Sequence, residues 1–141
     1  MSKKFQWGQT SIKRMDGVDP RIIRVLFRAI GIMSRKKDGI DMTIAWMGGI
    51  RTADQQNKLF LDGVSKCDGF KKKSEHQSGL AIDVIPYIKG INFYELPSIE
   101  QDFLFYKVAS VILEAGALEG VKISWGGNWS SWRDCPHYQI K

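Results

Sequence analysis

Only two histidines occur in this chain of 141 residues, and each has an aspartate near it in the sequence. His76 precedes Asp83 within the segment SEHQSGLAIDV, and His137 follows Asp134 in the segment DCPHY. Asp83 lies inside an apolar run, where a buried carboxylate costs stability unless another group pairs with its charge. Gly79 allows the chain to turn back between a loop that carries His76 and a strand that carries Asp83.

The residues before the second histidine favour an extended backbone. Pro136 has a fixed φ angle and biases Cys135 towards an extended conformation. We therefore expect the segment to enter the sheet with His137 beside Asp83. Asp134 would then lie just outside the group formed by the two histidines and Asp83.

Two imidazoles and one carboxylate suit a catalytic zinc site, which uses three protein ligands and a water molecule. Bound zinc lowers the pKa of water from 15.7 to about 7 and polarises a carbonyl group. A carboxylate such as Asp134 could accept the water proton and pass it to the leaving amine, which typically accelerates a reaction about 10²–10⁴-fold. Each residue alone also has an ordinary structural interpretation as a hydrogen-bonded side chain. Cys135 is an alternative ligand, and other divalent metals suit the same ligand set.

The two segments together resemble the D-Ala-D-Ala carboxypeptidase and endolysin family of zinc metallopeptidases. SEHQSGLAIDV is similar to the signature Ser-x-His-x-x-x-Gly-x-Ala-x-Asp, and DCPHY is similar to the signature with an acid three residues before the last histidine. The resemblance is closest to phage endolysins that cleave L-alanyl-D-glutamate bonds in peptidoglycan. It implies that His76, Asp83 and His137 bind zinc and that Asp134 is the general base.

The resemblance, which covers about residues 46–138, implies further site residues. Arg51, in GGIRTADQQNKLF, matches an arginine that stabilises the oxyanion or holds the substrate carbonyl. Ser74 matches a serine expected near the substrate, and Gln55 matches a glutamine on the following helix. Trp125 opens WGGNW, which resembles the Trp-Gly-Gly segment before the last signature. We therefore expect Ser74, Gln55 and Trp125 to take part in substrate binding.

The elements that must position these residues are helices and strands that follow one another along the chain without a regular alternation. Helical spacing is found in DPRIIRVLFRAIGIMSRK, TADQQNKLFLDG and LPSIEQDFLFYKVASVILEAG, and strand patterns in GIDMTIAW, LAIDVIP, VKISW and HYQIK. This order predicts an α+β fold in which helices pack on a small, mainly antiparallel sheet. The resemblance implies the Hedgehog and DD-peptidase type of fold. Residues 1–141 are expected to form one catalytic domain.

Capping and turn residues predict the boundaries of these elements. The predicted helix starts are Asp19 with Pro20, Thr52 with Gln55, and Ser98 with Gln101; the predicted helix ends are Gly63 and Gly116. We expect Pro86 to end one strand and Trp46 to lie on the buried face of another. The residues up to Gly17 are expected to form an irregular arm.

Charge and composition limit the partners. The formal net charge is +6, which favours a polyanionic partner: nucleic acid, anionic lipid or an acidic wall polymer. No recognition-helix or stacking motif supports a nucleic-acid partner. The N-terminal segment MSKKFQWGQTSIKRMDG is polar, unlike a secretory signal, and no apolar segment is long enough to cross a membrane. The two cysteines are expected to be free thiols.

The resemblance implies that the protein is a zinc-dependent peptidoglycan endopeptidase, an endolysin, that hydrolyses the L-Ala–D-Glu bond of stem peptides, and we expect it to be a monomer. We expect it to be made in the host cytoplasm and to reach the wall after the membrane has been permeabilised. One alternative is a D-alanyl-D-alanine carboxypeptidase or dipeptidase, which Asp134 in place of a glutamate disfavours. The other is a non-catalytic, zinc-stabilised module that binds the cell wall.

Overall fold

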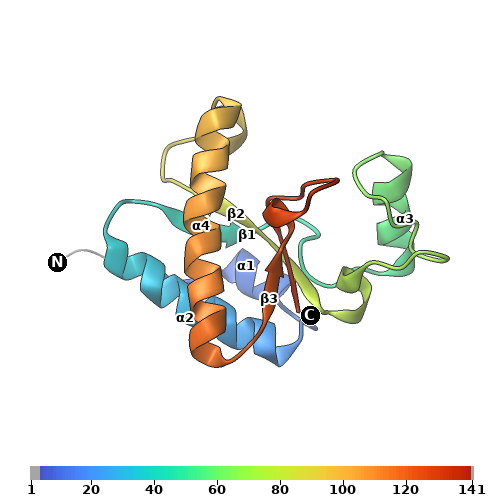
Figure 1. The fold of residues 1–141 in the computed structure, drawn as a ribbon, viewed down its shortest axis with the longest axis horizontal. Helices are drawn as coiled ribbons and strands as arrows, with labels where there is room; N and C mark the ends of the chain where they lie inside the picture. The colour runs from blue at the N-terminus through green and yellow to red at the C-terminus, as the bar shows by residue number, and fades with distance from the viewer. Residues whose placement is uncertain (1–3, 141) are drawn as a thin grey trace.

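Four antiparallel strands form one sheet in the order β1-β2-β4-β3 in the computed structural model, which describes residues 4–140 (Figure 1). The strands are β1 (Asp41–Ile44), β2 (Ala81–Tyr87), β3 (Ile123–Trp125) and β4 (His137–Ile140). Every pairing between neighbours is antiparallel. The predicted α+β class with a small antiparallel sheet is confirmed.

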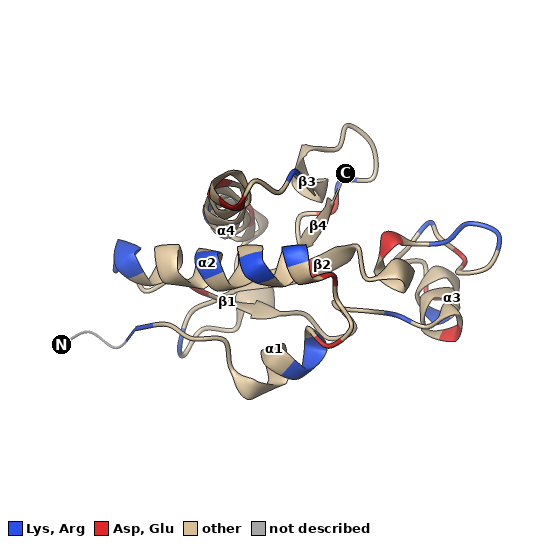
Figure 2. Ribbon diagram, turned by 90° about the horizontal axis from the view of Figure 1, so that it is seen from below, with Lys and Arg blue, Asp and Glu red and all other residues tan. Residues whose placement is uncertain are grey.

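The helices are α1 (Gln9–Arg14), α2 (Pro20–Lys36), α3 (Ala53–Leu61) and α4 (Ser98–Glu119). Short 3₁₀ turns, η1 (Glu75–Ser78), η2 (Phe93–Glu95) and η3 (Gly126–Asn128), occur in the connections. Figure 2 shows α1 and α4 on opposite sides of β1 and β2, while α2 packs against α4. None of the helices within residues 4–140 combines the length and apolarity that crossing a bilayer requires.

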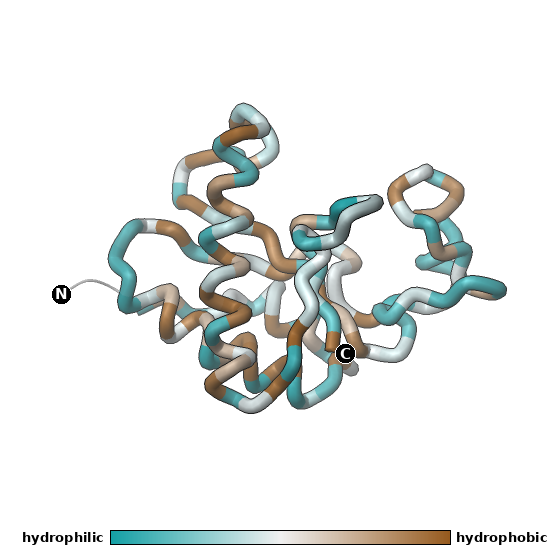
Figure 3. The backbone as a smooth tube through the Cα atoms, in the orientation of Figure 1, coloured by the Kyte–Doolittle hydropathy of each residue, from teal (hydrophilic) through white to brown (hydrophobic). Residues whose placement is uncertain are grey.

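Helix α2 starts where its capping residues predict. The Asp19 side chain accepts a hydrogen bond from the Arg21 amide, and Pro20 occupies the first helical position. The predicted apolar face is buried and consists of Ile22, Leu26, Ile30 and Met33. In Figure 3 hydrophobic and hydrophilic residues alternate along α2, as expected for a helix with one face in the core.

The predicted irregular arm contains helix α1, so this expectation was wrong. Gly8 supplies no side-chain cap, and a helix of this length is marginal on its own. Tertiary contacts hold it instead: the buried Ser11 hydroxyl lies 2.9 Å from Thr43 Oγ1 and accepts a hydrogen bond from the Ile44 amide at 3.0 Å. Residues 1–3 of the expected arm lie outside the described part of the chain.

Two predicted features of the strands also differ from the structure. Trp46 is 70% exposed, because β1 ends at Ile44 and the chain turns before the indole. Pro86 does not end β2 but pairs with Met42 of β1. Because β4 pairs only with residues 81–83, Pro86 lies where β2 has a neighbour on one side alone, and its missing N–H is tolerated there.

Helix α4 begins and ends differently from the prediction, whereas the capping box of Thr52 and Gln55 at α3 is confirmed. Pro97, not Ser98, is the N-cap residue of α4, and no side chain caps it. The helix continues past Gly116 to Gly120, which has a left-handed φ of 68°. Gly116 instead permits close packing, since a Cβ there would lie 3.0 Å from the Val121 carbonyl oxygen.

Gly79→Ala is expected to destabilise the protein more than Gly90→Ala. Both glycines have positive φ angles, 72° and 81°, where an L-residue costs about 1–2 kcal/mol. Only at Gly79 would the added Cβ also meet backbone, 2.6 Å from the Gly17 carbonyl oxygen, whereas nothing lies within 4 Å of it at Gly90. Urea unfolding would measure both losses. Equal losses would mean that the contact with Gly17 does not constrain the fold.

Candidate metal centre and its cavity

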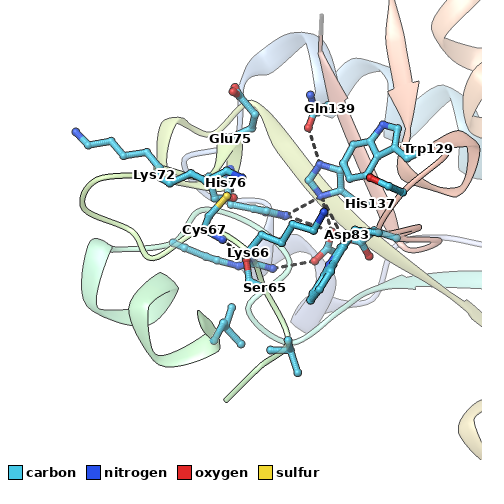
Figure 4. A pocket seen from close by; sticks show the side chains of 18 residues that line it. Ser65, Lys66, Cys67, Lys72, Glu75, His76, Asp83, Trp129, His137 and Gln139 are labelled. Carbon is cyan, nitrogen blue, oxygen red and sulfur yellow. Dashed lines mark hydrogen bonds and ion pairs between the residues drawn. The ribbon is translucent and has the colours of Figure 1, made fainter. Parts of the chain in front are cut away.

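His76, Asp83 and His137 come together although they belong to three different elements. His76 lies in η1, where the Ser74 side chain accepts a hydrogen bond from the His76 amide. Asp83 is in β2 and His137 in β4, and the two residues are directly paired in the register of these strands. The expectation that an extended segment would bring His137 beside Asp83 is therefore confirmed. Figure 4 shows the three side chains converging at one side of a cavity.

The distances within this group describe a shared centre. His76 Nε2 and His137 Nδ1 lie 3.2 and 3.3 Å from the same atom, Asp83 Oδ1, and 3.2 Å from each other. Asp83 Oδ1 is buried and has no hydrogen-bond partner among the described residues. A buried carboxylate oxygen without a partner needs a compensating charge, and two imidazole nitrogens point to the same place. These ligand types therefore fit a divalent cation such as zinc.

The electrostatics of the group favour an ionised Asp83. Burial alone would raise the pKa of Asp83, but the neighbouring ring nitrogens of His76 and His137 hold it well below its usual range. Burial likewise opposes the positive charge of His137, but the Asp83 carboxylate raises the pKa of that imidazole. A cation between these side chains would supply the same compensation for the buried carboxylate.

Two contacts outside the group orient the imidazole rings. His76 Nδ1 lies 2.9 Å from the Gly49 carbonyl oxygen, and His137 Nε2 lies 2.8 Å from Gln139 Oε1. If each ring donates its proton outwards, the other nitrogen keeps its lone pair for the shared centre. Sequence reasoning missed Gln139. The signal was the alternation along β4, because residues two apart on a strand face the same side.

Arg51 lies beside the second oxygen of the Asp83 carboxylate. Its Nη2 donates to Asp83 Oδ2 at 2.9 Å, its Nε to the Met47 carbonyl oxygen at 2.7 Å, and its Nη1 to Gln56 Oε1 at 3.1 Å. These three bonds fix the guanidinium at the cavity wall. Gln56, fully buried, is a second residue that sequence reasoning missed, and its amide also donates to the Cys67 carbonyl oxygen.

Asp134 lies at the edge of the group and not within it. Its Oδ2 is 4.0 Å from His137 Nδ1, and its side chain is 40% exposed. Burial, together with the negative charge of Asp83, raises the pKa of Asp134. A carboxylate that lines the cavity and has a raised pKa is suited to accept and return a proton.

The shared centre opens into a cavity of about 500 Å³ that Arg51, Ser74 and Asp134 also line. Two predicted substrate-binding residues do not line it. Gln55 is exposed, and its side chain accepts a hydrogen bond from the Thr52 amide in the capping box. Trp125 is only 4% exposed and stacks on Tyr138 in the core.

Trp129 and Trp132, in the segment that follows β3, line the cavity instead. The two glycines between the first and second tryptophans of WGGNWSSW could have indicated that the first packs in the core and the other two line the cavity. The first of them ends β3 and packs inwards, whereas the other two follow the glycine turn η3.

Comparison with known proteins identifies similar chains. The family model described as phage L-alanyl-D-glutamate peptidase matches residues 1–139. The chain is 32% identical to the L-alanyl-D-glutamate peptidase of Escherichia phage T5 over 97% of this chain and 90% of that relative. Its fold is similar to that of the Serratia marcescens L-Ala D-Glu endopeptidase ChiX, with a TM-score of 0.76, 22% identity and coverage of 99% and 92% of the two chains.

A Zn(II) complex of the vancomycin-resistance D,D-pentapeptidase VanY shares the fold at a TM-score of 0.57. Its sequence identity to this chain is 16%, over 87% of this chain and 72% of that one.

Zinc titration of the metal-stripped protein should show about one tight site per chain, as expected for a site with three protein ligands. His76→Ala and His137→Ala should each lose that site, because each removes one of the converging nitrogens. Asp134→Ala should keep it, because Asp134 lies outside the group. Unchanged zinc binding in either histidine variant would contradict the ligand assignment.

Gln139→Leu should weaken zinc binding about tenfold to a hundredfold, because the imidazole of His137 loses the partner that orients it. Gln55→Leu is the matched control, since Gln55 is exposed and does not line the cavity. Competition with a zinc chelator of known affinity measures both constants. Equal affinities for the two variants would mean that Gln139 does not orient the ligand.

Proposed function

Because this chain belongs to the phage L-alanyl-D-glutamate peptidase family, we propose that it hydrolyses the L-Ala–D-Glu bond of peptidoglycan stem peptides with the help of a bound zinc ion. The observation that carries this proposal is that ring nitrogens of His76 and His137 meet the buried Oδ1 of Asp83 at the wall of a cavity. These three residues would hold the zinc ion. When bound, the ion would polarise the scissile carbonyl and acidify a water molecule.

Asp134 is the general base in this proposal. Its carboxylate lines the cavity next to the ligand group, where it would take a proton from the attacking water. The same carboxyl group would then give the proton to the departing amine of D-glutamate. The raised pKa of Asp134 supports this role, since a group that both accepts and returns a proton works best when its pKa approaches the working pH.

Arg51 has two roles in the proposal. Its hydrogen bond to Asp83 Oδ2 holds that carboxylate with its other oxygen turned towards the histidines. A guanidinium has five N–H groups, and the three bonds to protein atoms leave others available. One of these would stabilise the oxyanion that forms on the substrate carbonyl. Such a preorganised donor typically contributes about 10²–10³ to kcat.

Ser74 is proposed to bind the substrate backbone. Its hydroxyl oxygen already accepts the His76 amide proton, so the hydroxyl proton is free to be donated into the cavity. The proposal further places the enzyme at the wall of a phage host, as a monomer, after the host membrane has been permeabilised.

Asp134→Asn should reduce cleavage of purified peptidoglycan by about 10²–10⁴, the usual contribution of general acid–base catalysis. Its zinc content and unfolding midpoint should match those of the wild type, because the amide keeps the shape of the carboxyl group and Asp134 lies outside the metal ligands. Product analysis should show new N-terminal glutamate in the wild-type digest.

Two results would refute this proposal. Release of D-alanine without new N-terminal glutamate would indicate a carboxypeptidase. Full activity of the Asp134→Asn variant would rule out Asp134 as the general base and would favour a differently organised catalytic site.

A further inference from the structure

Lys66 extends over the cavity from the segment between α3 and η1. Its Nζ lies 5.0 Å from the centre of the Trp132 ring, which belongs to the opposite wall between η3 and β4. Both residues line the cavity. Figure 4 shows Lys66 reaching towards the side where Asp83 and His137 lie, whereas Lys72 extends outwards. Figure 2 shows that the loop carrying these lysines is the basic protrusion beside α3.

The charge of Lys66 is not compensated within the described chain. Among residues 4–140, lysines pair with carboxylates only at Lys58–Asp62 and Lys107–Asp38. Arg51, the other cation near the ligand group, is already paired with Asp83. Lys72 and Lys73 also line the cavity without a carboxylate partner among residues 4–140, but of these three lysines Lys66 is the one whose ammonium lies over a tryptophan of the cavity wall.

A substrate with an L-Ala–D-Glu bond brings a negative charge into this cavity. Glutamate has two carboxyl groups, and only one of them can continue the peptide. When the peptide continues through the side chain, the free carboxylate is attached to the same carbon as the scissile nitrogen. It must then lie close to the carboxylates of Asp83 and Asp134, which repel it unless a cation is also present.

We propose that Lys66, seated on Trp132, binds the free carboxylate of the substrate's glutamate residue and so selects it over its neutral amide. This inference rests on the proposed function and names the group on the substrate that the cavity recognises. The Trp132 ring restricts where the ammonium can lie, because its face attracts a cation. Trp132 itself has a left-handed φ of 50°, an uncommon conformation for a bulky residue, and the surrounding loop must maintain it.

The test uses two peptides that differ in one group: N-acetyl-L-Ala-D-Glu linked through its side-chain carboxyl to L-Lys, and the same peptide with the free glutamate carboxylate converted to a carboxamide. The ratio of kcat/KM for the carboxylate peptide over the carboxamide peptide is measured for four zinc-loaded proteins. These are the wild type, Lys66→Gln, Lys66→Arg and Lys71→Gln. Lys71 is the matched control, because it is an exposed lysine of the same loop that does not line the cavity.

The wild-type ratio should be about tenfold, the lower end expected for a hydrogen bond to a charged group, because Lys66 is exposed. Lys66→Gln should bring the ratio close to one by slowing cleavage of the carboxylate peptide alone. Lys66→Arg and Lys71→Gln should keep the wild-type ratio.

A wild-type ratio near one, or an unchanged ratio in Lys66→Gln, would overturn the inference and leave the proposed function in place. An equal fall on both peptides in Lys66→Gln would also overturn it, because Lys66 would then only hold the two walls of the cavity together. Failure of the wild type to cleave either peptide would refute the proposed function, and the inference would fall with it.

Discussion

The buried carboxylate of Asp83 is the constraint on which the rest of the site depends. It is carried by β2, one of the two central strands of the sheet, where an uncompensated charge is costly. Each of its oxygens has a different neighbour: Oδ2 accepts a hydrogen bond from Arg51, and Oδ1 faces the two imidazoles. The surrounding elements therefore have to position an arginine beside Oδ2 and two histidines beside Oδ1.

The backbone meets this requirement through close contacts and strand register. Gly79 turns the chain between η1 and β2 against the backbone of Gly17, which keeps His76 near Asp83. The pairing of Asp83 with His137 follows from the register of β2 and β4, in which a shift by one residue would turn the imidazole to the other face. Gly49 and Gln139 then fix the two rings.

The sequence was informative where local chemistry decides structure. The spacing around His76 and the proline before His137 predicted that His76, Asp83 and His137 come together, with His137 beside Asp83 in the sheet. The roles of Gln55 and Trp125 were not predictable in the same way. The Gln55 side chain accepts a hydrogen bond in the capping box of α3. Trp125 packs on Tyr138, a tertiary contact that no local sequence pattern indicates. Gln56 was missed for the same reason, whereas the alternation along β4 could have indicated Gln139.

Some residues of the proposed site lie on paired strands, and others lie on loops. Asp83 and His137 are on paired strands, which hold ligands to the tolerance that a metal centre requires. Asp134, Lys66 and Trp132 are on the connections that form the cavity walls, where sequence changes disturb the fold least. If the proposed roles hold, substitutions in these loops would change substrate preference without disturbing the proposed metal ligands. In the proposed enzyme, the paired strands would position the metal ligands, and the loops would determine which peptide is placed against them.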